Sequence, residues 1–185
     1  MASDSGRAAA VSAPVLARPI HHVGFHVPDL RAAIDTWVTV HGAGPFYLLE
    51  HVGFDECTSR GTPAGWDHSA AFGQCGAVPV ELQQVHDLRP LELAGAFTAD
   101  GRGAVNHVGI VTHDAAAESA RLESLGFELS MYARLGELEF FWHDARKAFG
   151  YCIEVITAGQ RLDAFWDTVA GGARDWDGRD PVRTL

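Results

Sequence analysis

Two segments of the chain repeat one order of hydrophobic and polar positions. Residues 20–38 read IHHVGFHVPDLRAAIDTWV, and residues 105–123 read VNHVGIVTHDAAAESARLE. When His22 is placed on His107, the Val-Gly pair that follows each histidine aligns as well. A shared order of this kind indicates an internal repeat, which constrains the fold more strongly than any single element does.

Each repeat begins as a short apolar strand and continues with the spacing of a helix. Asp29 and Asp114 align, and each can cap a helix N-terminus by accepting bonds from backbone N–H groups. Gly42 and Gly126 stand where these helices are expected to end. The apolar positions between them recur at helical intervals, namely Leu30, Ile34 and Trp37, then Ala117, Ala120, Leu122 and Leu125.

The two repeats also end alike. Residues 78–85 read VPVELQQV and residues 151–156 read YCIEVI, so that Glu81 falls on Glu154 between hydrophobic neighbours. A β-hairpin is predicted ahead of each glutamate, although residues 43–70 are Gly-rich and irregular. The sequence therefore predicts an α+β fold built from two tandem β-α-β-β-β modules.

The same pattern sets the expected boundaries. Residues 1–17, rich in Ala and Ser, are predicted to be a flexible tail, and residues 18–158 one domain with modules at about 18–88 and 103–158. Residues 159–185 are expected to form a C-terminal helix and a polar, turn-rich tail that includes WDGRDPVR. The helix is indicated by apolar residues at helical spacing, Leu162, Phe165, Trp166 and Val169.

Composition and charge narrow the function classes. The 185 residues are 47% hydrophobic and 21% charged, which is typical of one globular domain. A formal net charge of −10 without a cluster of Lys or Arg argues against nucleic-acid binding. No apolar run approaches the roughly 20 residues that span a membrane. Cys57, Cys75 and Cys152 form no CxxC pair, so free thiols in a reducing compartment, the cytoplasm, are expected.

The matched polar residues suggest a metal site. Strand alternation lets the two aligned histidines and the two aligned glutamates face one interior. An ionised carboxylate among apolar residues is costly to bury alone, and a shared cation removes that cost. Imidazole and carboxylate suit Zn, Ni, Co, Mn or Fe. One divalent metal ion is therefore predicted, with the ligands His22, Glu81, His107 and Glu154.

Two of these ligand positions have alternatives. His21 competes with His22 on the first strand, although agreement with the second repeat favours His22. Gln83 faces the same way as Glu81 and could replace it. A lone histidine in a strand is also an ordinary hydrogen-bonded core residue, so the prediction depends on the coincidence of all four positions.

Other residues are candidates for a substrate pocket. His26 shares a strand face with His22, and Gln83 shares one with Glu81. Trp66 and Phe141, together with Phe72 and Trp142, could form an apolar wall. Packing in the core is the alternative for each of these residues.

The combined pattern IHHVGFHVPDL, VELQQV, NHVGIVTHD and GYCIEVI resembles the vicinal oxygen chelate superfamily, over about residues 18–158. This superfamily includes glyoxalase, methylmalonyl-CoA epimerase, extradiol dioxygenases and the bleomycin- and fosfomycin-resistance proteins. The resemblance implies paired modules whose sheet curls, like part of a barrel, around a metal cleft. Four ligand positions are more similar to the glyoxalase and epimerase branch than to the others.

For that branch the resemblance implies proton abstraction next to a carbonyl of a small molecule, through a metal-stabilised enediolate, as in an isomerase, epimerase or lyase. Glu154 is then the expected base and Glu81 its counterpart. Two other classes stay open: an Fe(II) dioxygenase of the extradiol type, which would not need Glu81, and a protein that binds a small molecule without turnover. Members often pair as dimers, and strand edges or the C-terminal helix could form a homodimer here.

Overall fold

The computed structural model describes residues 14–90 and 104–184. The strands are β1 (His22–His26), β2 (Phe46–Val52), β3 (Glu56–Ser59), β4 (Thr62–Pro63), β5 (Gly65–Cys75), β6 (Val78–Arg89), β7 (Val105–Thr112), β8 (Leu129–Leu135), β9 (Leu138–His143), β10 (Cys152–Thr157) and β11 (Val182–Thr184). The helices are α1 (Leu30–His41), α3 (Ala115–Ser124), α4 (Arg146–Phe149) and α5 (Gln160–Ala173).

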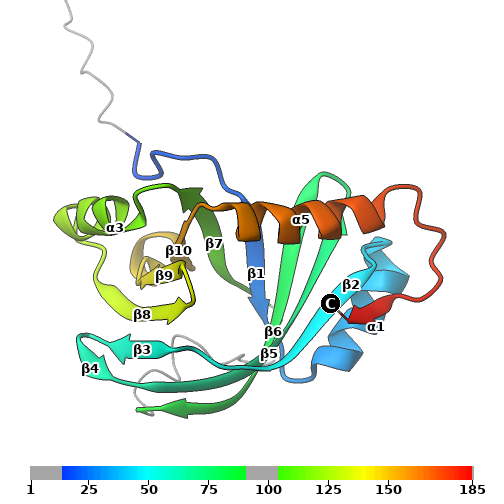
Figure 1. Ribbon diagram of the computed structural model, residues 1–185, viewed down its shortest axis with the longest axis horizontal. Helices are drawn as coiled ribbons and strands as arrows, with labels where there is room; N and C mark the ends of the chain where they lie inside the picture. The colour runs from blue at the N-terminus through cyan, green and yellow to red at the C-terminus, as the bar shows by residue number, and fades with distance from the viewer. Residues whose placement is uncertain (1–13, 91–103, 185) are drawn as a thin grey trace, which may run out of the picture.

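All of these strands belong to one sheet with the order β11-β2-β5-β6-β1-β7-β10-β9-β8-β3-β4. The first repeat supplies β1, α1, β2, β5 and β6, and the second supplies β7, α3, β8, β9 and β10. In each repeat the first strand lies parallel to the last, and β1 meets β7 antiparallel at the centre. The predicted α+β fold of two β-α-β-β-β modules is confirmed (Figure 1).

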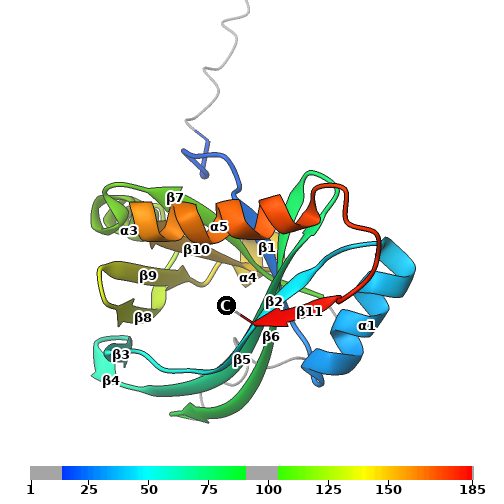
Figure 2. The same cartoon turned by 45° about the vertical axis from the view of Figure 1, so that its right-hand side comes forward.

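The sheet curls until the two repeats meet a second time. β3 and β4 lie in the connection between β2 and β5, within the stretch whose sequence is irregular. β3 pairs antiparallel with β8 of the second repeat, so the first repeat reaches the far edge of the second. The curl stays unclosed, with β4 and β11 at the two ends of the strand order (Figure 2).

Alternating side chains give the sheet an apolar outer face. In the first repeat, Ile34 of α1 packs with Leu82 of β6, and in the second, Leu122 of α3 packs with Ile153 of β10. Successive strand residues point to opposite faces. The residues on either side of Leu82 and Ile153 therefore face the inside of the curl.

Helix α5 covers that inner face. Its residues Leu162, Trp166 and Val169 pack in one cluster with Tyr47 of β2 and Ile156 of β10. Figures 1 and 2 show the helix running along the open side of the curled sheet. The apolar spacing in the sequence predicted this helix, and the packing shows which surface it buries.

The helix ends follow the sequence closely. Asp29 accepts a hydrogen bond from the backbone N of Ala32, and Asp114 accepts one from that of Ala117, both at 3.0 Å. Gly42 ends α1 with a positive φ of 62°, a conformation that glycine adopts without strain. In the second repeat α3 ends at Ser124, and Gly126 follows its cap residue.

The two terminal segments differ from their sequence-based descriptions. Residues 1–13 of the expected flexible tail lie outside the described residues, whereas Val15 and Leu16 pack against the core of the second repeat. The polar C-terminal tail contains a strand, β11, which pairs parallel with β2. Turn-forming composition hid this strand because its hydrogen bonds go to a segment far away in the sequence.

Within the described residues, no helix combines the length and hydrophobicity of a membrane span.

Candidate metal centre

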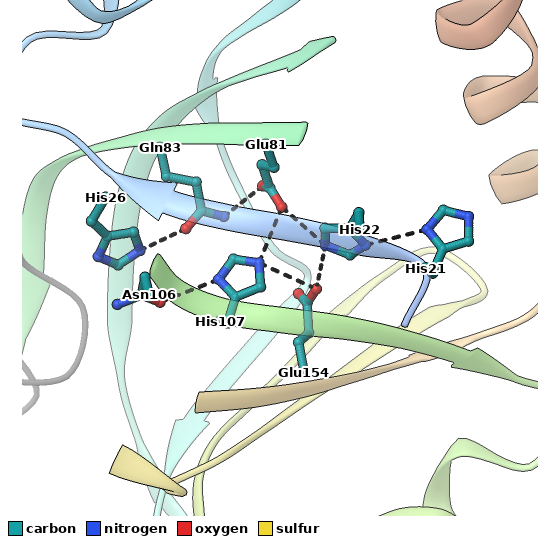
Figure 3. Close-up of polar contacts among 8 residues, drawn as sticks. All are labelled: His21, His22, His26, Glu81, Gln83, Asn106, His107 and Glu154. Atoms are coloured by element: carbon teal, nitrogen blue, oxygen red, sulfur yellow. Dashed lines mark hydrogen bonds and ion pairs between the residues drawn. The ribbon is translucent and has the colours of Figure 1, made fainter. Parts of the chain in front are cut away.

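Four neighbouring strands at the middle of the sheet bring together the aligned histidines and glutamates. β6, β1, β7 and β10 are consecutive in the sheet, and the side chains they present converge (Figure 3). They are Glu81, His22, His107 and Glu154, whose potential ligand atoms all lie within 4.8 Å of one another. The arrangement has the symmetry of the repeat, because each module contributes one histidine from its first strand and one glutamate from its last.

The register of β1 and β7 explains why each histidine is followed two residues later by glycine. His22 is paired with Gly109, and His107 is paired with Gly24. A Cβ atom added to Gly24 would overlap the His107 ring, and one added to Gly109 would overlap the His22 ring. Each ring therefore lies across the backbone of the opposite strand, in space that only glycine leaves free.

The distances within the cluster are those of ion pairs. Nε2 of His22 lies 3.1 Å from Oε2 of Glu154 and 3.4 Å from Oε2 of Glu81. Nε2 of His107 lies 3.3 Å from Oε2 of Glu81 and 3.6 Å from Oε2 of Glu154. All four residues are at most 5% exposed. Each Nε2 thus faces both carboxylates, and each carboxylate faces both rings.

Burial and the neighbouring charges shift the pKa values of this cluster in opposite directions. Burial alone would lower the pKa of His22, but the contacts and charges of Glu154 and Glu81 outweigh it and raise the pKa to about 9. Burial would raise the pKa of Glu81, and the contacts with His107 and His22 hold it well below its ordinary value instead. The two carboxylates therefore favour the protonated form of His22.

The donor set fits a divalent metal ion. Nε2 of both histidines and Oε2 of Glu154 are buried, and none makes a hydrogen bond with a described residue. Buried polar atoms ordinarily have hydrogen-bond partners, so three such atoms aimed at one point indicate a missing partner. Two imidazole nitrogens and two carboxylate oxygens are a ligand set for a first-row metal. His22, Glu81, His107 and Glu154 could hold such an ion.

Neighbouring side chains fix the orientation of this set. Gln83 donates a hydrogen bond from Nε2 to Oε1 of Glu81, and His26 donates one from Nε2 to Oε1 of Gln83, both at 2.6 Å. Nδ1 of His107 lies 3.2 Å from Oδ1 of Asn106. Such contacts leave Nε2 and one carboxylate oxygen pointing inward, the usual arrangement around a protein-bound metal. Figure 3 shows Gln83 behind Glu81, away from the centre of the cluster.

His21, the alternative ligand on the first strand, takes a different place. Its Nδ1 lies 3.3 Å from Nδ1 of His22, on the side of that ring opposite to the carboxylates. Its ring packs against Trp166 of α5. His21 therefore supports the orientation of His22 and stands outside the converging set.

A cavity of about 160 Å³ opens on the cluster, inside the curl and beneath α5. His22, Glu81 and Glu154 line it, and so do two of the predicted pocket residues, Trp66 and Gln83. Most of its remaining wall is apolar and comes from α5 and from the inner face of the sheet, including Leu49, Phe72, Phe140, Trp142, Ile156, Phe165 and Trp166.

Two predicted pocket residues lie elsewhere. Phe141 is on the outer face of β9, in the cluster that α3 covers, while its neighbours Phe140 and Trp142 line the cavity. In the aromatic run FFW the sequence does not show which side chains face the cavity, because all three positions are apolar. His26 stands behind Gln83, to which its Nε2 donates a hydrogen bond, and it is outside the lining of the cavity.

The prediction from sequence did not include two polar residues that line the cavity, His68 of β5 and Arg161 of α5. His68 is 3% exposed and stacks on the Trp66 ring with centroids 4.1 Å apart. Burial lowers the pKa of His68 to about 4, so the ring is neutral at pH 7. The alternation of buried residues in β5 could have indicated His68, whereas nothing in the sequence linked Arg161 to a pocket.

Comparisons with known proteins agree with this geometry. A family model described as "Glyoxalase/Bleomycin resistance protein/Dioxygenase superfamily" matches residues 21–139. A methylmalonyl-CoA epimerase from Mycobacterium tuberculosis has a similar fold, with a TM-score of 0.51 and 21% identity over 78% of this chain and 91% of that one. A hypothetical protein, BH1468 from Bacillus halodurans C-125, gives a TM-score of 0.53 and 15% identity over 78% and 96%. No curated protein matches the sequence.

Adding a side chain at Gly24 or Gly109, over which the histidine rings lie, should displace those rings. We expect Gly109→Ala to lower the free energy of unfolding by about 1–3 kcal/mol, the usual cost of overpacking, and Gly24→Ala to do the same. Urea unfolding measures this change. Gly53→Ala is the matched control, because a Cβ there meets no atom within 4 Å. Equal stability of all three variants would contradict the crossing of rings over glycines.

The metal-free protein should lose stability in mild alkali. The folded pKa of His22, about 9, lies above the ordinary 6.5. The proton on His22 therefore stabilises the fold fully below pH 6.5, and this contribution is lost as the pH rises through 9. We expect a fall of roughly 3 kcal/mol across that window in urea unfolding with a chelator present. The decline should be absent in His22→Gln, and a wild-type curve that stays flat would refute the raised pKa.

Proposed function

Because the chain belongs to the glyoxalase, bleomycin resistance protein and dioxygenase superfamily, we propose that it is a metal-dependent enzyme. The proposed reaction is proton transfer at a carbon next to a carbonyl of a small-molecule substrate. The observation that carries the proposal is the buried cluster of His22, Glu81, His107 and Glu154, which offers converging ligand atoms beside a largely apolar cavity. The likeness to the epimerases supports the fold, and the reaction is inferred from this site.

The four clustered residues would hold the metal. When bound, a divalent cation supplies a Lewis acid that draws electron density from a carbonyl oxygen and so acidifies the adjacent C–H bond. Its binding also requires the proton to leave His22, since an imidazolium nitrogen has no free electron pair. Metal affinity should therefore rise with pH up to the pKa of His22, about 9.

Glu154 is the proposed base. Glu81 and Glu154 are the only carboxylates that line the cavity among the described residues. Gln83 donates a hydrogen bond to one oxygen of Glu81, whereas the ion-pair contacts of Glu154 are with the two histidines. Glu154 is therefore the carboxylate with more freedom to accept a proton, and Glu81 is its counterpart. With one base the proton returns to the substrate as in an isomerase, and with both it can cross faces as in an epimerase.

The cavity wall would assist this transfer by excluding water. Its apolar side chains, among them Phe140, Trp142 and Trp166, surround the carboxylates on the substrate side. A dry surrounding prevents solvent from competing for the proton. The neutral ring of His68 adds a polar group without adding charge.

Metal content tests the site. Protein purified without a chelator or an affinity tag should contain close to one metal ion per chain by elemental analysis. The double variant Glu81→Ala, Glu154→Ala should contain none, while Glu123→Ala, Glu137→Ala, which removes two exposed carboxylates, should retain it. An empty wild type that also fails to take up Zn, Ni, Co, Mn or Fe would overturn the proposal. Iron with turnover that consumes oxygen and tolerates loss of Glu81 would indicate a dioxygenase instead.

Solvent exchange tests the base. Metal-loaded protein should exchange deuterium from D₂O into the carbon next to the carbonyl of at least one member of a set of 2-hydroxy acids, 2-oxo acids and thioesters, as followed by proton NMR. Glu154→Gln should slow this exchange by a factor of about 10²–10⁴, the usual contribution of a general base. Metal content and thermal unfolding are measured on the same samples. Undiminished exchange in Glu154→Gln would remove that residue from the mechanism.

A further inference from the structure

The cavity is lined by two buried carboxylates and one exposed arginine. Glu81 and Glu154 stand at its inner end, where both face the histidines. Arg161 is the single arginine or lysine in the lining formed by the described residues. It is exposed, so it lies at the side of the cavity that solvent reaches.

Arg161 has no partner in the described part of the protein. It makes no ion pair or hydrogen bond there, although the chain carries 24 acidic residues and a net charge of −10. The guanidinium lies beside the turn between β8 and β9, where a Cβ added to Gly136 would be 3.5 Å from its Nη1. Leu135 and Leu138 on either side of that turn also line the cavity. The arginine thus stands at the rim, with its donors available to a ligand.

The interior beyond Arg161 suits a flat apolar group. Trp66, Phe140, Trp142 and Trp166 line it, and its volume is about 160 Å³. An engineered apolar cavity of about 150 Å³ in another protein holds one benzene molecule. The interior therefore has room for a ring or a branched chain of about that size, and a bulky carrier group would have to stay outside.

We propose that the substrate is a compact carboxylic acid with an aromatic or branched apolar substituent. The substituent packs against the aromatic side wall, the carboxylate pairs with Arg161 at the rim, and the carbon that loses its proton faces Glu154 at the inner end. A bidentate arginine–carboxylate pair would also set the angle at which the substrate enters. The position of the reacting carbon rests on the proposed function. The carboxylate and the apolar substituent are inferred from Arg161 and from the cavity wall.

The test is a comparison of two ligands of nearly equal shape, mandelate and the neutral mandelamide. Binding to the metal-loaded protein is measured by quenching of tryptophan fluorescence, since Trp66, Trp142 and Trp166 line the cavity. We expect mandelate to bind at least tenfold more tightly than mandelamide, because hydrogen bonds between charged groups contribute about that much. The Arg161→Gln variant should lose this preference. The Arg174→Gln variant, which removes an exposed arginine near the other end of α5, should keep it.

Each other outcome overturns the proposal. Equal affinity for the two ligands would show that no cation selects the acid. A preference that survives Arg161→Gln would assign the carboxylate to another group, such as the metal. Absence of quenching by either ligand would mean that the interior does not accept a ring. Quenching by coenzyme A that depends on Arg161, without quenching by mandelate, would assign the arginine to a phosphate. Because none of these measurements needs turnover, they fail independently of the deuterium-exchange test of Glu154.

Discussion

The crossing of two histidine rings over two glycines is the constraint on which the centre of this protein depends. β1 and β7 are antiparallel, and their register pairs His22 with Gly109 and His107 with Gly24. A shift by one residue would turn both histidines to the outer face, since side chains alternate along a strand. Two further registers, of β1 with β6 and of β7 with β10, place a glutamate of each outer strand beside one of these glycines. Three pairings of adjacent strands thus bring the four potential ligands together.

The cluster also presents an energetic problem that the fold alone does not solve. Four ionisable side chains are almost wholly buried, and separation from water is costly for each charge. Mutual ion pairs and the one hydrogen bond from Gln83 offset part of this cost, but three inward atoms stay without hydrogen bonds that meet the usual geometry. Buried groups without hydrogen bonds are retained where they serve a ligand or a reaction. A cation that accepts electron pairs from both histidines and both glutamates would satisfy all of these atoms.

Helix α5 and the two repeats contribute different parts of the site. The repeats supply the polar cluster by their symmetry, whereas α5 follows the second repeat and lies outside both modules. It closes the inner face with Leu162 and Trp166 and brings Arg161 to the rim of the cavity. The converging polar residues therefore come from the duplicated sheet, and in our proposal the contact that selects the substrate comes from the added helix. Function is thus to be argued from the site, since one fold can serve many reactions.

The sequence by itself determined the repeat, the helices with their Asp caps and the four converging residues, because local periodicity and internal symmetry are properties of the chain. Asp29 and Asp114 bond to the backbone nearby, and His22 and His107 follow from one motif read twice. Only the tertiary structure decided which aromatic residues face the cavity, that His68 and Arg161 belong to it, and that the polar tail forms β11. Phe141 shows the reason: in a run of apolar residues the inward side is set by neighbouring strands and helices, which the sequence of one segment does not specify.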